Sequence, residues 1–330
     1  MLNLMNDSRI AVGFQGIGLM EEAFSVAKNY TKERKTWGKP IAEHELVLEK
    51  LLDMEIELKT CRSVLYNAAY LHSVNNILEA ALKREEVTGK TELKEKIARN
   101  VRKLRDVTPL IKYWIGERSF RFARDVLQLH GGNGYMTEYK PEWLVRESII
   151  YSLYEGTSQI QALMAMKDSI KEVLRAPKSF IERSVSLRLR GLSETDDLKR
   201  QYLRMRLDLQ SALTSILFKV VKSNVRPVVS EASRYDILQI IKLFKSKLSH
   251  AEKLSHAVLH AERFTEIKCL VRVSSQLLRD RAKDPTRDWI ARRFIQKATL
   301  RIAYLKAQIE QDETVVLDRI GKLKQGGVKE

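Results

Sequence analysis

The sequence predicts an all-α protein built from two helical domains. Apolar residues recur at spacings of three and four through most of the 330 residues, which is the period of an amphipathic helix. Only 14 glycines and 6 prolines interrupt the chain. A chain of this length can form two domains that each bury a core. We expect residues 1–176 to form the first domain and residues 177–330 the second, with the boundary at Ala176-Pro177.

The first helix is predicted from an apolar face close to the N-terminus. Gly13 and Gly16 remove side chains from this segment, so we expect a second helix to cross it at close range. Lys39-Pro40 ends the pattern, since the residue before a proline is pushed out of the α region. The residues of the apolar face are Ile10, Phe14, Ile17, Phe24 and Ala27.

A second, long helix is predicted after Pro40, and a third one after Gly89-Lys90. The stripe that defines the second helix consists of Val47, Leu51, Met54, Leu58, Cys61, Leu65 and Ala68. The third helix is expected from Thr91 to His130, where Gly131-Gly132-Asn133-Gly134 stops it. Three glycines in four residues allow positive φ and a close approach to a ligand, although a plain helix-ending turn has the same composition.

Two further helices complete the first domain. Pro141 is expected to start a short helix that contains Arg146. Gly156-Thr157 opens the next helix, whose apolar stripe consists of Ile160, Leu163, Met166 and Ile170.

The second domain is predicted to be a helical bundle because it almost lacks glycine-rich turns. Gly191 is the only glycine between Gly156 and Gly321. Asn224 to Pro227 and Asp284-Pro285 separate the later helices. One stripe is formed by Tyr202, Met205, Leu209, Ala212, Ile216 and Val220.

The net charge of +17 is concentrated in the second half of the chain. Residues 1–170 contain 25 Lys and Arg against 23 Asp and Glu, whereas residues 171–330 contain 34 against 19. A basic helical domain can meet nucleic acid, anionic lipid or an acidic protein. The charges are dispersed and no nucleic-acid-reading motif accompanies them, so a solvated basic surface is the favoured interpretation and a nucleic-acid partner is not expected.

Cysteine and histidine usage predicts neither a disulfide framework nor a metal site. Cys61 and Cys269 lie far apart and are expected to be small core or surface residues. His256 and His260 are one helical turn apart, but His250 lies six residues before His256 and no acidic ligand is well placed. No metal is expected.

The sequence also predicts a cytoplasmic location. No uninterrupted apolar run reaches the ~18 residues that a membrane helix needs. The segment from Met1 to Arg9 lacks the order of a basic region followed by an apolar region that defines a signal peptide.

Three motifs occur in a fixed order along the first half of the chain. They are YTKERKTWGKPI (Tyr30 to Ile41), QLHGGNGY (Gln128 to Tyr135) and YEGTSQIQ (Tyr154 to Gln161). On these motifs, the chain from about Asn3 to Leu174 resembles the C-terminal helical half of flavin-dependent acyl-CoA dehydrogenases.

The resemblance implies a fold and an activity. The first domain is expected to be the four-helix up-and-down bundle of this family, followed by a second helical bundle as in its longer members. The expected reaction is the α,β-dehydrogenation of a fatty acyl-CoA or a related acyl-CoA, with FAD as cofactor. The expected partners are acyl-CoA as substrate, further copies of the chain in a dimer or tetramer with FAD at the subunit interfaces, and an electron-transfer flavoprotein as electron acceptor.

The resemblance assigns Glu155 as the general base. Dehydrogenation requires a base that removes the α-proton while a hydride leaves the β-carbon for the flavin. A glutamate is a feeble base in water, and burial away from positive charge raises the pKa of such a carboxylate. Hydrogen bonds to the thioester oxygen, one of them from the Glu155 amide, would stabilise the enolate-like charge.

The resemblance also implies which residues contact the cofactor. Arg34 would bind the FAD pyrophosphate across a subunit interface, and Trp37 would form an aromatic wall where the family commonly has phenylalanine. His44-Glu45 stands where the family usually has His-Gln, and the carboxylate of Glu45 would repel phosphates unless it points elsewhere. The complete set is Arg34, Thr36, Trp37, His44, Glu45, Gln128, Gly131, Gly132, Thr157 and Gln159.

The substrate contacts are expected near the N-terminus and at the base. Asn6, Ser8 and Arg9 fall where the family places polar contacts to the CoA portion and to the base loop, and Gly156 would leave space for the acyl chain and the flavin. Arg146 is expected to be structural, with Glu147 standing where aspartate is usual.

The family's N-terminal helical domain and its middle β domain have no counterpart in this sequence. We therefore expect a fragment, or one half of an enzyme whose other domains come from a separate chain. The alternative is a non-catalytic helical module that keeps the ancestral interface and binds partners without a flavin.

Overall fold

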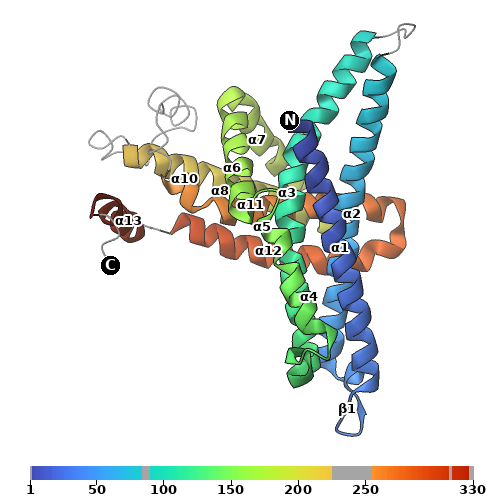
Figure 1. Cartoon of the computed structure of the whole chain (residues 1–330). Coiled ribbons are helices and arrows are strands. Elements are labelled where there is room, and N and C mark those ends of the chain that lie inside the picture. The colour runs from blue at the N-terminus through green and yellow to red at the C-terminus, as the bar shows by residue number, and fades with distance from the viewer. Residues whose placement is uncertain (1, 84–89, 225–254, 312–313, 327–330) are drawn as a thin grey trace. The chain divides into compact units, whose positions relative to one another are not determined.

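The computed structural model describes residues 2–83, 90–224, 255–311 and 314–326. Within these ranges the protein is almost entirely helical, so the all-α fold is confirmed (Figure 1). The chain divides into two compact units. The first contains Met1–Ala162 and Gln276–Ile290, and the second contains Leu163–Ser275 and Ala291–Glu330. This division by contacts differs from the expected boundary at Ala176-Pro177, which stays a prediction for the folding domains.

The first part of the chain forms helices where the apolar stripes predict them. The elements are α1 (Leu2–Glu33), β1 (Lys35–Thr36), β2 (Lys39–Pro40), η1 (Ile41–Glu43), α2 (Glu45–Leu82), α3 (Lys90–His130), η2 (Gly131–Tyr135), α4 (Lys140–Ser148), α5 (Ile150–Leu153) and α6 (Ser158–Arg175). The predicted end of the third helix at His130 is confirmed, as is the short helix that contains Arg146.

The remaining elements are also helical. They are α7 (Pro177–Ser193), α8 (Asp197–Asn224), α10 (Ser255–Leu259), α11 (Ala261–Lys283), η5 (Pro285–Arg287), α12 (Asp288–Glu310) and α13 (Thr314–Gly326). Asp284-Pro285 separates α11 from η5, as predicted, and the Asp284 side chain accepts a hydrogen bond from the Thr286 amide. Residues 225–227, the second predicted break, lie outside the described residues.

The core of the first unit lies between three long helices. α1, α2 and α3 run side by side, and α4 packs on α3 (Figure 1). A Cβ at Gly13 would lie 2.7 Å from Leu65 Cδ1, and one at Gly16 would lie 2.7 Å from Ile115 Cγ2. The predicted close crossing is therefore confirmed, and α1 makes it with both α2 and α3.

α1 also contains a strongly apolar segment. Within the described residues, its segment Asp7–Glu33 is long and apolar enough to cross a membrane by length and composition, which differs from the expectation that no segment would qualify. Half of its most apolar window is buried inside the structure, as in the core helix of a helical bundle.

The second unit has its own core, in which α8 supplies the predicted stripe. Met205, Ala212, Ile216 and Val220 are buried. Arg301 on α12 donates two hydrogen bonds to Glu266 on α11, at 2.9 and 2.8 Å. Such a bidentate pair fixes the position of two helices more strictly than a single contact.

Both cysteines are buried thiols, which confirms that they are not disulfide-bonded. Among the residues that the structure describes, no three His, Cys, Asp or Glu side chains gather into a metal-binding group. His250 lies outside those residues.

Candidate active site

A strained turn between α5 and α6 carries Glu155. Glu155 has φ of +57° and Gly156 has φ of +91°, so two successive residues are in the left-handed region. Such a conformation costs a non-glycine residue about 1–3 kcal/mol and persists only where surrounding contacts enforce it. Strain of this kind is frequent at functional positions.

Gln161 is the contact that enforces this turn. Its Nε2 donates hydrogen bonds to the carbonyl oxygens of Glu155 and Gly156, at 3.0 and 3.2 Å. The Gln161 side chain is completely buried, so solvent does not compete for these bonds. A Cβ on Gly156 would lie 2.7 Å from the same Nε2 atom, which leaves room for glycine alone.

The residues on either side of the turn also hold its ends. Thr157 Oγ1 accepts a bond from the Ile160 amide at 3.4 Å, so Thr157 caps α6. The Tyr154 hydroxyl donates to Gln15 Oε1 on α1. The Lys112 ammonium on α3 donates to the Ser152 carbonyl at 3.1 Å. The backbone around Glu155 is thus tied to two neighbouring helices.

Two cations face Glu155 from these neighbouring helices. Arg9 on α1 is 3% exposed and Lys112 is 0% exposed. Burial lowers the pKa of both side chains, that of Lys112 to about 8, and the charge of Glu155 opposes the shift in each case. α1 and α3 therefore bring two positive charges to the turn, whereas the sequence argument considered the burial of a glutamate without a positive partner.

Glu117 completes the charged group around the turn. It raises the pKa of Lys112, and its Oε1 accepts a hydrogen bond of 2.5 Å from the buried Ser158 hydroxyl at the start of α6. The negative charges of the exposed Glu117 and the half-exposed Glu155 compensate the two buried cations. The arrangement can hold the Glu155 carboxylate at a fixed point while its half-exposed side chain stays open to a ligand.

The predicted substrate contacts lie partly in the same place. Arg9 is next to the turn, Ser8 is half-buried on α1, and Gly156 is part of the turn itself. The side chain of Asn6 lies outside the described part of the structure. Of the two predicted cofactor residues near the base, Thr157 caps α6 and Gln159 is exposed.

A second group of predicted site residues surrounds the β1–β2 hairpin. Lys35 pairs with Pro40 and Thr36 pairs with Lys39, which leaves Trp37-Gly38 as a two-residue loop. Both loop residues have positive φ, +50° and +83°, as a type I′ turn requires. Trp37 is 93% exposed despite this strained conformation, so burial in a core does not explain the aromatic side chain.

The other residues of the hairpin group are also at the surface. Arg34 is exposed, and Thr36 Oγ1 lies 3.0 Å from His44 Nε2. The His44 ring meets Trp37 edge to face, at 5.5 Å between centroids. Glu45 is exposed in the first turn of α2, where the helix N-terminus stabilises a carboxylate.

The glycine turn after α3 lies at the same end of α1 as the hairpin. Tyr30 stacks on His130 at 4.0 Å between ring centroids, and its hydroxyl donates to the His130 carbonyl at 3.2 Å. Asn133 Nδ2 donates to the same hydroxyl at 3.2 Å. These contacts tie the C-terminal part of α1 to the turn.

The glycines of this turn expose bare backbone. Gly131 has φ of +57°, and no atom lies within 4 Å of the Cβ position at Gly131 or Gly132. Gln128 is exposed on the preceding turn of α3. The backbone of Gly131 and Gly132 is therefore open to a ligand or a partner.

The structure thus brings the predicted site residues together in two places. Arg9 and Arg34 lie near opposite ends of α1, roughly 37 Å apart at 1.5 Å per helical residue. Sequence reasoning missed Lys112 and Gln161 as parts of the site. Gln161 is the last residue of the YEGTSQIQ motif. Lys112 could have been recognised as a buried cation because its neighbours in the α3 sequence are apolar.

The first half of the chain is similar to known proteins. The family described as "Acyl-CoA dehydrogenase, C-terminal domain" matches residues 1–170. A 3-(aryl)acrylate reductase from Clostridium sporogenes is 29% identical over 170 residues, which cover 52% of this chain and 38% of the relative. An acyl-CoA dehydrogenase from Bacillus subtilis is 31% identical over 165 residues, which cover 49% of this chain and 36% of the relative. The chain therefore spans well under half of these relatives.

Solved structures extend the likeness to the second unit at the level of the fold. The crystal structure of an acyl-CoA dehydrogenase complexed with FAD from Bacillus anthracis matches 98% of this chain and 52% of its own, with a TM-score of 0.65 and 16% identity. Caenorhabditis elegans ACDH-11 in complex with C11-CoA matches 99% and 48%, with a TM-score of 0.58 and 20% identity. Because the family match covers residues 1–170 of 330, this chain belongs to the acyl-CoA dehydrogenase family.

Proposed function

We propose that this chain supplies the catalytic base and part of the cofactor site of an FAD-dependent acyl-CoA dehydrogenase. The observation that carries the proposal is the Glu155 turn, in which two left-handed residues are held by a fully buried glutamine next to two buried cations. A solvated surface glutamate needs no such support.

Glu155 would act as the general base of α,β-dehydrogenation. Its carboxylate takes the α-proton of the acyl thioester, and bound FAD would supply the acceptor for the β-hydrogen, which leaves as a hydride. The Glu155 amide donates to the thioester oxygen and stabilises the charge that develops there. Gln161 fixes the backbone of the turn, because it donates hydrogen bonds to the carbonyl oxygens of Glu155 and Gly156. The carboxylate and the amide of Glu155 therefore keep a constant position relative to each other.

The hairpin and the glycine turn fit an FAD held between copies of the chain. Arg34 offers a cationic fork for phosphate, Trp37 an exposed aromatic face, and Gly131-Gly132 a backbone without side chains. The ~37 Å between this group and Arg9 supports a dimer or tetramer in which one copy contributes the hairpin to the cofactor of another.

The remaining parts of the enzyme would come from outside these 330 residues. The chain covers 36–38% of the relatives described above, so we propose that another chain or another part of a longer protein completes the acyl-CoA pocket. An electron-transfer flavoprotein is the proposed electron acceptor. Acyl chain length depends on the whole pocket.

The visible absorption spectrum tests the proposal. The chain is purified alone and after co-expression with any partner that is encoded upstream, and acyl-CoA is then added. Flavin bands that bleach with substrate support a dehydrogenase, and bands that need the co-expressed protein support a split enzyme. A colourless protein in both preparations favours the alternative, a non-catalytic helical module.

Glu155→Gln isolates the role of the base. The variant should retain flavin and lose its reduction by acyl-CoA, because an amide cannot accept the α-proton. Glu138→Gln, at an exposed position outside the site, is the control and should be reduced like the unsubstituted protein. Undiminished reduction of Glu155→Gln would refute the assignment.

A further inference from the structure

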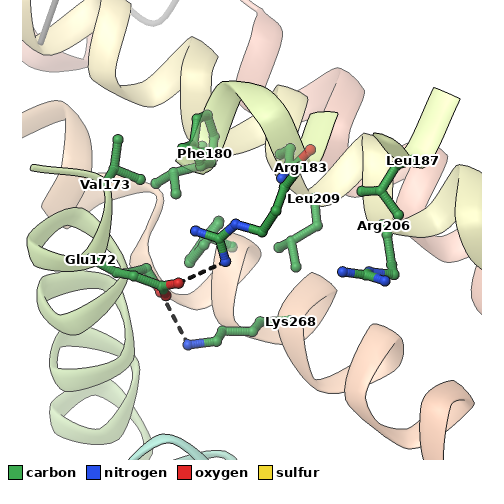
Figure 2. A pocket seen from close by; sticks show the side chains of 12 residues that line it. Glu172, Val173, Phe180, Arg183, Leu187, Arg206, Leu209 and Lys268 are labelled. Carbon is green, nitrogen blue, oxygen red and sulfur yellow. Dashed lines mark hydrogen bonds and ion pairs between the residues drawn. The ribbon is translucent and has the colours of Figure 1, made fainter. Parts of the chain in front are cut away.

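The second unit contains a hollow that the Glu155 turn does not use. It lies between α6, α7, α8 and α11 and has a volume of about 130 Å³ (Figure 2). A single water needs about 10–15 Å³ by this kind of measure, so the hollow has space for a small organic molecule.

One side of the hollow is apolar and rigid. Five of its lining side chains belong to the core of the second unit, each no more than 6% exposed, and they are Val173, Phe180, Leu187, Leu213 and Phe264. Side chains that are packed on their other faces cannot collapse to fill the space. This wall suits a hydrocarbon group.

The other side is cationic. Figure 2 shows Arg183, Arg206 and Lys268, from α7, α8 and α11, around the same hollow, with Glu172 as the carboxylate among the lining residues. Arg183 donates to Glu172 at 2.7 Å, and the Lys268 ammonium donates to the Ser169 hydroxyl at 3.1 Å. The rim therefore has three cations against one anion.

Arg206 is the cation of this group that keeps its donors available. Its guanidinium lies 5.9 Å from the centre of the Tyr202 ring. Across the described residues, no carboxylate lies within ion-pair distance of it. Gln210 also lines the hollow, and its Oε1 accepts a bond of 2.7 Å from the Ser184 hydroxyl, which leaves the amide hydrogens as donors.

We propose that this hollow binds a small amphiphilic carboxylate, such as the anion of a short-chain fatty acid. The hydrocarbon part lies against the apolar wall, and the carboxylate accepts hydrogen bonds from Arg206 and Gln210. A guanidinium suits a carboxylate because its parallel N–H groups match the two oxygens.

The lining argues against other small ligands. A bare phosphate leaves the apolar wall uncovered, and a neutral alcohol leaves the Arg206 fork without an anion. A cation is repelled by the rim. The volume restricts the hydrocarbon part to a short chain, below the usual 300–1,000 Å³ of pockets that enclose larger ligands.

Calorimetric titration of the whole chain with sodium hexanoate tests the proposal. Saturable 1:1 binding is expected. Arg206→Ala should weaken it about tenfold or more, the loss expected when a charge-assisted hydrogen bond is removed. Arg204→Ala is the matched control, because Arg204 is exposed on the same helix, two positions away and outside the lining, and should leave the affinity unchanged.

A series of titrants separates this site from general charge attraction. Hexanoate should bind more tightly than acetate, inorganic phosphate and hexanol. Absence of saturable hexanoate binding, equal binding of phosphate, or an equal loss in Arg204→Ala would each overturn the proposal. If Arg206→Ala fails to fold, Arg206→Lys keeps the charge without the fork, and hexanoate binding as tight as in the unsubstituted chain would contradict the role of Arg206.

Discussion

Lys112 shows how burial changes the chemistry of one residue. The sequence pattern predicts the third helix, but by itself it does not predict that Lys112 is buried, because lysines usually lie at the surface. The structure buries it completely and gives its ammonium one hydrogen bond to Ser152 and the charges of Glu117 and Glu155 as compensation. The cost of burial is visible in its pKa, which falls to about 8.

Lys112→Met should flatten the pH dependence of stability in alkaline solution. The pKa of Lys112 is about 8 in the folded protein and ~10.4 in an unfolded chain. Between these values the unfolded chain binds more protons, so stability rises with pH, by at most ~1.4 kcal/mol per pH unit from this group. Urea titrations from pH 8 to pH 10 measure the rise, which should be smaller in the variant.

The exposed Lys103 on the same helix provides the control for this measurement. Lys103→Met should keep the slope of the unsubstituted protein. If Lys112→Met keeps that slope as well, Lys112 is charged in the folded protein throughout this range, and burial does not lower its pKa.

Gly156→Ala should destabilise the protein by about 1–3 kcal/mol. Alanine would have to adopt a φ of +91°, and its Cβ would lie 2.7 Å from Gln161 Nε2. Denaturant unfolding measures the loss. Gly18→Ala is the control, because Gly18 is exposed in α1 with no atom near its Cβ position, and alanine there should stabilise by up to ~1 kcal/mol.

Neither cysteine should react with a thiol reagent in the folded protein. Cys61 is 0% exposed and Cys269 is 2% exposed, and burial raises the pKa of the Cys61 thiol. Both should react once the protein is denatured. Ser193→Cys places a thiol at an exposed position of α7 and should react at once, which shows that the reagent is active. Rapid native labelling of the unsubstituted chain would contradict the burial.

At the scale of elements, the two candidate site regions are turns rather than helices. The Glu155 turn joins α5 to α6, and the Trp37-Gly38 loop joins β1 to β2. Both contain a non-glycine residue with positive φ. Gln161 on α6 holds the Glu155 turn, whereas the pairing of β1 with β2 sets the conformation of Trp37. Binding residues on loops that a rigid scaffold positions are common in enzymes.

Trp37→Asn should separate the stability of the hairpin from its function. Asparagine tolerates positive φ better than tryptophan, so the free energy of unfolding should stay the same or rise by up to ~1 kcal/mol. The flavin content of the assembled enzyme should fall, because the exposed aromatic face is lost. Trp37→Phe keeps an aromatic ring and should retain flavin. Full flavin content in Trp37→Asn would argue against a cofactor contact there.

At the scale of the whole molecule, charge and chemistry are separated along the chain. The Glu155 turn and the hairpin belong to residues 1–170, which are nearly neutral, whereas residues 171–330 hold most of the net charge of +17. Several basic residues of the second unit are already in ion pairs, such as Arg301 with Glu266 and Lys306 with Asp208. This supports the interpretation of a solvated basic surface.

Binding to DNA should therefore be weak and independent of sequence. A polyanion attracts dispersed cations by counterion release, so the association constant should fall steeply as salt rises. Fluorescence anisotropy with two unrelated duplexes of equal length measures this. Equal affinities that vanish near physiological salt are expected. A sequence-dependent affinity that persists in salt would restore the nucleic-acid interpretation.

Periodicity predicted most of the buried faces, since an apolar residue at every third or fourth position can bury only one side of a helix. Phe14 and Ile160 of the predicted stripes are exceptions, because both are exposed. The stripe from Met54 to Ala68 is in the core, the third helix ends at His130, and the all-α class is confirmed. Glycine composition likewise indicated open backbone at Gly131 and Gly132. The order of three motifs indicated the family.

The partners of each face were decided only by tertiary packing. A stripe states that a face is buried but not against which helix, so the meeting of Arg9, Lys112 and Glu155 from three elements could not be predicted. The hydrogen bonds from Gln161 to the turn and the hollow beside Arg206 have the same origin. Sequence determines local periodicity and chemistry, whereas distances between remote residues depend on how whole helices pack.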